Sequence, residues 1–242
     1  MQQEIINAVD AAIEKLADLF TRQPTQFFTE NDLVCGVHRL VTDSLKSVGL
    51  TFSDKEGLPH TLIHGEYPTP FRCDMSERDF QEKGDEDRTA TRKKYKRGHY
   101  DIVVLNPEFI GRHSYSQIKC QDFDEFLSEV APSLTDAEPM ILYGVELVFS
   151  RDPIPLSKGR EPERAARAFV EEVVQDTKKL AATVAKPKFM KQAAMLAFTK
   201  GTSREVNNLI RTLLRNQIPC ERMARLIDAY SAADGGGDRM LN

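Results

Sequence analysis

Apolar residues recur at intervals of three and four along several stretches of the chain, and this spacing predicts α-helices. The expected helices cover residues 2–20, 29–49, 123–130, 163–184, 203–216 and 220–233. In the second of these, Thr29 is placed to be the N-cap with Asp32 three residues later, and Gly49 is expected to end the helix.

Other stretches are apolar with little interruption and are bounded by turn residues, which predicts β-strands. The clearest are residues 101–105 and 140–149, whose unbroken hydrophobic runs are typical of central strands covered on both faces. Residues 60–67 and 192–199 are expected to be further strands. The resulting order of helices and strands favours an α/β fold with a mixed sheet flanked by helices. We expect one domain over residues 1–233 and a flexible tail over the glycine-rich residues 234–242.

Length and charge narrow the class of protein. The 242 residues suffice for one core without disulfide staples, and the net charge of -4 argues against a protein that coats nucleic acid through bulk charge. The four cysteines form no Cys-x-x-Cys pair, so reduced thiols are expected and a zinc site is not. We find neither a signal peptide nor a membrane-length apolar run, which favours a cytoplasmic protein without a membrane partner.

Three acidic residues occupy unusual positions in this pattern. Glu146 lies inside a strongly apolar predicted strand, where a carboxylate is costly unless it is paired, protonated or bound to a metal. Asp101 opens the other central strand, and Glu30 lies in the first turn of the second helix. Each also has an ordinary explanation: a salt bridge for Glu146, a turn residue for Asp101, and a favourable interaction with the helix dipole for Glu30.

A polar stretch over residues 74–97 leads into Asp101, and its second half is strongly basic. Cations at this density can follow a phosphate backbone, and Tyr95 among them can stack on a base. The alternative is a solvated loop that balances its own acidic first half. The candidate nucleic-acid-binding residues are Arg92, Lys93, Lys94, Lys96 and Arg97.

Taken together, these elements resemble the core of the PD-(D/E)XK nuclease superfamily. That core has a helix glutamate, a hairpin with an aspartate on one strand and Glu-x-Lys on the next, then a helix and another strand. Three further features are similar to bacterial members: Glu66-Tyr67-Pro68, the basic run before Asp101, and Asp176-Thr177-Lys178-Lys179-Leu180. The resemblance covers roughly residues 25–200. It implies a restriction-endonuclease-like fold, with a mixed four-stranded core sheet flanked by helices and extra N- and C-terminal helices.

The resemblance also implies a metal site. Asp101 and Glu146 would bind Mg²⁺, or Mn²⁺ in its place, with Glu30 as an outer ligand and Glu66 within reach. The family's lysine position is occupied here by Val148, which can carry no charge. A displaced cation is therefore expected from the following helix, where the candidates in order of preference are Lys178 and Lys179. Arginines 72, 97 and 151 are the other candidates.

His99 lies two residues before Asp101 and can act as a base or as a partner of the metal ligands; a solvent-facing polar role is the alternative. The same choice applies to His64, which shares a strand face with Glu66 and for which a structural role is favoured.

Two functions remain open at this level. The first is a Mg²⁺-dependent nuclease, compatible with a homodimer that cuts two strands. The second is a catalytically silent module of the same fold that binds nucleic acid or a partner protein, which Val148 and the acidic net charge favour. A lysine ammonium within about 4 Å of the Asp101–Glu146 pair would favour catalysis. The sequence contains no phosphate-binding loop, dinucleotide fingerprint, nucleophile elbow or His-Glu-x-x-His motif.

Overall fold

The computed structural model describes residues 1–46, 48–74, 81–83, 96–150, 161–200, 202–217 and 224–229. Its main helices are α1 (Gln2–Arg22), α2 (Glu30–Leu45), α3 (Pro107–Arg112), α4 (Tyr115–Lys119), α5 (Phe123–Glu125), α6 (Glu161–Val184) and α7 (Arg204–Gln217). A 3-10 turn (Pro24–Gln26) joins α1 to α2, and a π-helical turn (Phe126–Val130) follows α5. The strands are β1 (Thr51–Ser53), β2 (Pro59–Thr61), β3 (Ile63–Asp74), β4 (Gln81–Lys83), β5 (Lys96–Leu105), β6 (Ile141–Ser150), β7 (Met190–Lys200) and β8 (Ala224–Ala229).

A mixed sheet forms the centre of the molecule, which confirms the mixed α/β class. Its described strands lie in the order β4-β3-β5-β6-β7-β8, so the sheet has six strands where four core strands were expected. β3, β5 and β6 pair in antiparallel fashion, whereas β6, β7 and β8 are parallel to one another. Parallel neighbours require crossover connections, and α6 and α7 provide them.

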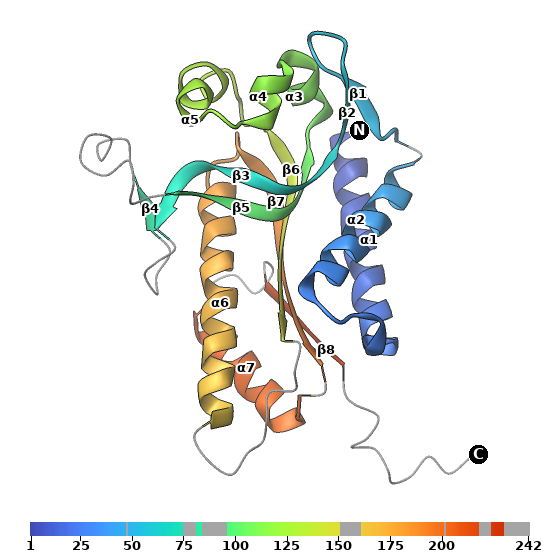
Figure 1. Cartoon of the computed structure of the whole chain (residues 1–242), viewed down its shortest axis with the longest axis vertical. Helices are drawn as coiled ribbons and strands as arrows, with labels where there is room; N and C mark the ends of the chain where they lie inside the picture. The colour runs from blue at the N-terminus through green and yellow to red at the C-terminus, as the bar shows by residue number, and fades with distance from the viewer. Residues whose placement is uncertain are drawn as a thin grey trace.

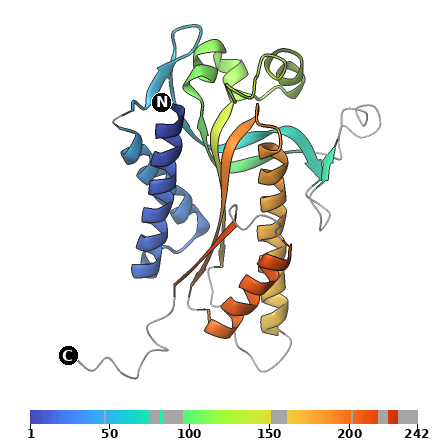
Figure 2. The same ribbon diagram turned by 180° about the vertical axis from the view of Figure 1, so that it is seen from behind.

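Helices cover both faces of this sheet (Figures 1 and 2). α6 and α7 pack together on one face, and α1 and α2 pack together on the other. The segment α3–α5 lies beyond the upper end of β5 and β6 in Figure 1. Every residue of β6 from Ile141 to Val148 is buried, as its continuous hydrophobic run predicted. No described helix is both long enough and apolar enough to cross a membrane.

The two faces of β6 meet different helices, and this divides its side chains into two sets. Tyr143 donates a hydrogen bond to Asp10 of α1 at 2.6 Å, and Phe149 packs edge-on against Phe20 of α1. The alternate residues face α6: a side chain at Gly144 would contact Met190 and Leu180. Glu146 belongs to this second set because side chains alternate along a strand.

The N-terminus of α2 is fixed by the predicted cap. The Thr29 hydroxyl accepts the Asp32 N–H at 3.3 Å, and the Asp32 carboxylate accepts the Thr29 N–H at 2.9 Å. The predicted end of this helix is wrong, because α2 ends at Leu45 and not at Gly49. Gly49 has a φ of 99° and donates to the Leu45 carbonyl at 3.1 Å, so it closes the turn that follows the helix.

The helix predicted for residues 220–233 is also wrong. Residues 224–229 form β8, which pairs with β7 in parallel from Ala224 opposite Met195 to Ala229 opposite Lys200. The free backbone groups at the edge of β7 need partners, and pairing with them overrides a weak helical pattern. Residues 230–242, including the tail predicted to be flexible, lie outside the described residues.

Candidate functional site

Asp101 and Glu146 lie on neighbouring antiparallel strands at the place where their ladder ends. The last regular pair is Ile102 opposite Val145, and Asp101 and Glu146 are the next residue of each strand. Beyond this pair a side chain replaces the backbone as acceptor: Oδ2 of Asp101 accepts the Leu147 N–H at 2.6 Å. The strand register therefore places these two acidic residues side by side, as the sequence predicts.

The cation beside them comes from α6. The ammonium of Lys179 lies 2.6 Å from Oε1 of Glu146, 3.1 Å from Oδ1 of Asp176 and 2.9 Å from the His99 carbonyl oxygen. An ammonium has three N–H donors, so these three oxygens match its full donor capacity. The Tyr100 ring, 5.8 Å from the ammonium, adds a cation–π contact. Lys179 is 5% exposed, whereas Lys178 points outward and is exposed.

Val148 shows why the cation arrives from a helix. Its side chain is buried and lies on the same face of β6 as Glu146, toward α6. A lysine there would point at the same site, but valine leaves the carboxylates without a charge from their own strand. Of the two candidates in 178–179, the one that reaches the site is Lys179, and the preference for Lys178 is not supported.

Glu146 is the most deeply buried carboxyl described at this site, with 2% of its surface exposed. Burial raises its pKa well above the ordinary value, the nearby Lys179 opposes this rise, and Asp176 and Asp101 add to it. Its Oε1 is in contact with the ammonium of Lys179, the cation that accompanies this buried oxygen.

The other carboxyls at this site repel one another. Burial raises the pKa of Asp101, the Leu147 N–H and Lys179 lower it, and Asp176 and Glu66 raise it further. On α6, burial and the charge of Asp176 raise the pKa of Glu172. One ammonium therefore serves several carboxyls, and their mutual repulsion disfavours the ionised forms. We refer to Asp101, Glu146, Glu172, Asp176, Lys179 and Glu30 as the carboxylate cluster.

Glu30 completes the cluster from the opposite face of the sheet. It is the first residue of α2, and its Oε2 accepts the N–H of Phe149, three residues beyond Glu146, at 3.1 Å. Burial and then repulsion from Asp101 raise its pKa to about 7. The capped end of α2 thus holds a third carboxyl against the same strand.

Two members of the cluster, Glu172 and Asp176, were not predicted as site residues. The signal for them is their spacing. Glu172, Asp176 and Lys179 are four and three residues apart, so they lie along one edge of α6. Lys178 is rotated away from that edge. The same helical spacing places Lys179, and not Lys178, on the edge of α6 that carries Glu172 and Asp176.

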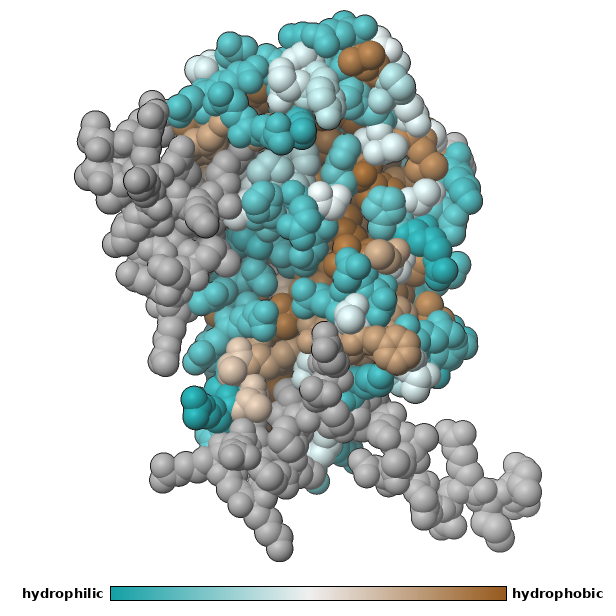
Figure 3. Space-filling view, viewed as in Figure 1, coloured by the Kyte–Doolittle hydropathy of each residue, from teal (hydrophilic) through white to brown (hydrophobic). Residues whose placement is uncertain are grey.

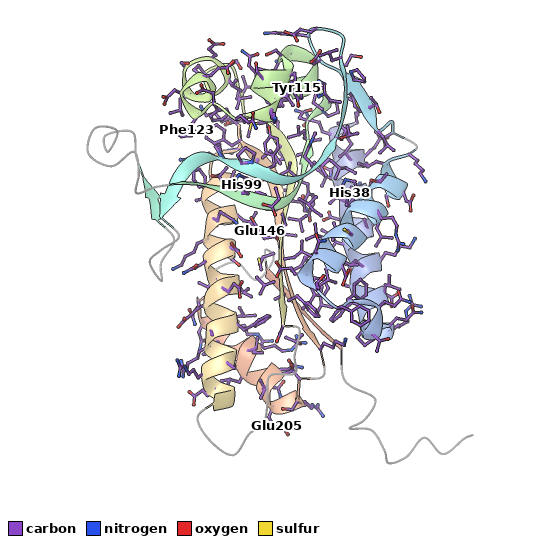
Figure 4. The ribbon with its side chains drawn as sticks, viewed as in Figure 1. His38, His99, Tyr115, Phe123, Glu146 and Glu205 are labelled. Carbon is purple, nitrogen blue, oxygen red and sulfur yellow. The ribbon has the colours of Figure 1, made fainter. Side chains whose placement is uncertain are left out.

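The remaining predicted residues lie at the margin of the cluster. Glu66 is exposed, with an unusual φ of 51°, and stands on β3 between residues paired with Tyr100 and Ile102. The His99 side chain is exposed, and its backbone carbonyl is what contacts Lys179. The His64 ring accompanies Glu66 on β3 and makes a 2.8 Å hydrogen bond with the Thr61 carbonyl. Figure 4 shows Glu146 below β5 between α6 and α2, with His99 above it.

The basic candidates fall largely outside the described residues. This holds for Arg92, Lys93, Lys94 and Arg151, and the structure describes the backbone alone at Arg72, Lys96 and Arg97. Lys96 and Arg97 begin β5, the strand that carries Asp101.

The carboxylate cluster borders a groove on the other side of the β3–β5 hairpin. This groove has a volume of about 930 Å³ and lies between β3 and the α4–α5 segment. Glu66 and His99 belong to its lining and also adjoin the cluster. On the face in Figure 3, a strip of hydrophobic surface runs beside α2 between hydrophilic surfaces, and smaller hydrophobic patches lie elsewhere.

The carboxylates of the cluster can be compared with the ligands that a divalent ion uses in proteins. Within the described residues, no three His, Cys, Asp or Glu side chains are grouped closely enough to hold a metal by themselves. Mg²⁺ is commonly bound through one or two carboxylates together with waters and substrate phosphates. Asp101 and Glu146 are two carboxylates on neighbouring strands, so in donor type they suit Mg²⁺, but Oε1 of Glu146 is already in contact with the ammonium of Lys179.

Comparisons of the chain with protein families, with curated proteins and with solved structures find no match. The functional argument therefore depends on the geometry of the carboxylate cluster and the groove.

Proposed function

We propose that this protein is a metal-dependent phosphodiesterase acting on nucleic acid, with a core of the PD-(D/E)XK type. The observation that carries the proposal is the buried ammonium of Lys179, 2.6 Å from Glu146 and beside Asp101. This is the geometry set out above as favouring catalysis. The strand order supports the fold assignment: an antiparallel β3-β5-β6 unit is followed by α6 and the parallel strand β7.

Each residue has a physical task in this proposal. Asp101 and Glu146 would hold Mg²⁺ or Mn²⁺, which would supply a water of lowered pKa and positive charge beside the scissile phosphate. Glu30 holds a proton near neutral pH and can accept one from the attacking water when ionised. Lys179 remains charged, because Glu146 and Asp176 raise its pKa more than burial lowers it. Its ammonium then offsets negative charge at the phosphate.

The silent module remains a second candidate, and the full coordination of Lys179 favours it. With three oxygens around the ammonium, no N–H remains for a phosphate unless Glu146 or Asp176 gives way. In an active enzyme, a divalent ion bound by Glu146 would displace the ammonium. In a silent module, Lys179 would occupy the site permanently as an internal cation.

Titration calorimetry with Mg²⁺ and Mn²⁺ distinguishes the two. We expect wild type to bind, and Asp101→Asn and Glu146→Gln to lose binding by at least about ten-fold, because each removes one of two anionic ligands. Glu205→Gln is the matched control, since Glu205 is an exposed glutamate in the first turn of α7 (Figure 4) and lies outside the cluster. Its affinity for the ions should equal that of wild type.

Lys179→Met supplies the second arm of this experiment. If the ammonium competes with the metal, the variant binds Mn²⁺ as tightly as wild type or more tightly. It should nevertheless cleave single- and double-stranded DNA and RNA about 100-fold more slowly, the loss typical of removing one charge-stabilising donor. Wild type that binds neither ion, with or without an oligonucleotide, would overturn the catalytic proposal in favour of the silent module.

A further inference from the structure

The groove above the carboxylate cluster has a rigid aromatic wall. Tyr115 of α4 is 52% exposed, and its ring stacks on that of His60 with centroids 5.7 Å apart and planes 23° apart. The His60 ring is held by Asp54, whose Oδ2 lies 2.9 Å from Nε2. The Asp54 side chain is fully buried and also accepts the N–H groups of Glu56 and Leu58. An exposed ring fixed in this way is a platform for another planar ring.

The α4–α5 wall of the groove carries charges of both signs. Lys119 of α4 holds its ammonium 5.7 Å from the centre of the Tyr115 ring. Asp122 and Asp124 line the part near α5, and Oδ1 of Asp122 caps the short turn there. In Figure 4, Tyr115 and Phe123 lie above β3, on the side away from Glu146. Asp122 and Asp124 repel a phosphate inside the groove. Their carboxylates can accept hydrogen bonds from amino groups.

These features describe one kind of occupant: a neutral planar ring that carries hydrogen-bond donors and has its anionic attachment near Lys119. A volume of about 930 Å³ also exceeds what a single ring needs and accommodates its sugar. A nucleobase has this chemistry. The groove meets the cluster at Glu66 and His99, so a base in it belongs to a nucleotide close to the scissile phosphate.

We propose that this groove binds an unpaired nucleobase of the substrate on the Tyr115–His60 platform, so that the protein selects single-stranded nucleic acid. The proposal rests on the proposed function for the identity of the substrate. A base inside a duplex reaches such a platform only after the cost of unstacking and unpairing, whereas a base in a single strand avoids most of it. The selection therefore comes from the groove and not from the metal ligands.

The test is fluorescence anisotropy with labelled oligonucleotides of about ten nucleotides. The probes are one DNA and one RNA single strand, the matching duplex, and nucleoside monophosphates as competitors. Binding is measured in EDTA, so that neither cleavage nor metal binding contributes. We expect wild type to prefer the single strands, and Tyr115→Ala to bind them at least about five-fold more weakly, the lower end for loss of one stacked base. Tyr115→Phe keeps the ring and should bind as wild type does.

Lys119→Ala should weaken single-strand binding and reduce its dependence on salt, whereas Lys15→Ala, which removes an exposed lysine on α1, should change neither. Equal binding of Tyr115→Ala and wild type overturns the proposal. So does wild type that binds duplex as tightly as single strand, or binds no oligonucleotide at all. A labelled nucleoside monophosphate that binds where the strands do not would also overturn the proposal and reassign the groove to free nucleotides. Because the assay contains no metal, its failure is separate from failure of the calorimetry with Glu146→Gln.

Discussion

At the scale of single residues, the shortest contact of the cluster joins a strand to a helix: Oε1 of Glu146 lies 2.6 Å from the ammonium of Lys179. A glutamate within an unbroken apolar strand has to be neutralised, and this requirement identifies Glu146 from sequence alone. Its partner cannot be identified in the same way. Several cations lie within reach in the sequence, and the choice of Lys179 depends on the rotation of α6 against the sheet. The spacing of Glu172 and Asp176 places them on the same edge of α6 as Lys179, but the sequence does not show that this edge faces the sheet.

The raised pKa of Glu30 leads to a prediction about stability and pH. Its pKa is about 7 in the folded protein against 4.5 when unperturbed, so between these values the folded state holds the proton more tightly. The stabilisation from that proton is complete below pH 4.5 and is lost as the pH rises through 7. Glu30→Gln removes the titrating group and keeps an oxygen for the Phe149 N–H. We therefore expect wild type to lose stability relative to Glu30→Gln between pH 5 and pH 8, as measured by urea unfolding.

Glu205→Gln is the control, because it removes an exposed glutamate from the first turn of another helix. Its stability relative to wild type should be the same at both pH values. If Glu30→Gln and Glu205→Gln show equal pH dependence, the carboxyl of Glu30 titrates as an ordinary exposed glutamate and its link to Asp101 is disproved.

At the scale of elements, the helices and central strands followed from periodicity, and the errors arose where periodicity is ambiguous. Residues 101–105 lie within β5, all but the first of residues 140–149 lie within β6, and residues 163–184 lie within α6. Residues 224–229 form a short, mostly apolar run, which suits either a helix or a strand. Pairing with the open edge of β7 makes this run a strand, and that edge is formed by residues far away in the sequence.

The cap of α2 is an element whose stability contribution can be measured. Thr29→Ala removes the hydroxyl that accepts the Asp32 N–H, and loss of such a cap costs about 1 kcal/mol. We expect this decrease in the free energy of unfolding. A frayed first turn would also release Glu30 from Phe149, so the Mn²⁺ affinity should fall together with the stability.

Thr42→Ala is the matched control in the middle of the same helix, where the exposed hydroxyl bonds back to the His38 carbonyl at 2.7 Å. Alanine has the higher helix propensity, so the stability should stay within about 0.5 kcal/mol of wild type or rise. Equal losses from Thr29→Ala and Thr42→Ala would show that the cap contributes nothing particular.

At the scale of the whole molecule, β8 protects an edge of the sheet. It covers the backbone of β7 from Met195 to Lys200, and its buried Ile227 belongs to the hydrophobic core. A chain that ends at residue 217 would leave the backbone groups of β7 unpaired along a flat, apolar strand. We expect such a chain to self-associate, with a higher molar mass in light scattering than the full chain.

A chain that ends at residue 229 keeps β8 and provides the comparison. It should have the same molar mass as the full chain at every concentration tested. If the chain ending at residue 217 also keeps that molar mass, then β8 is dispensable and another segment covers the edge of β7.

The arrival of Lys179 from α6 has a consequence for how relatives of this chain are to be found. A search pattern that requires glutamate and lysine two residues apart on one strand rejects this sequence at Val148. The charge that such a pattern seeks is present, but it is encoded on the next helix, in phase with Glu172 and Asp176. A pattern that combines a strand aspartate, a buried strand glutamate and a helical Glu-x-x-x-Asp-x-x-Lys would retain this chain.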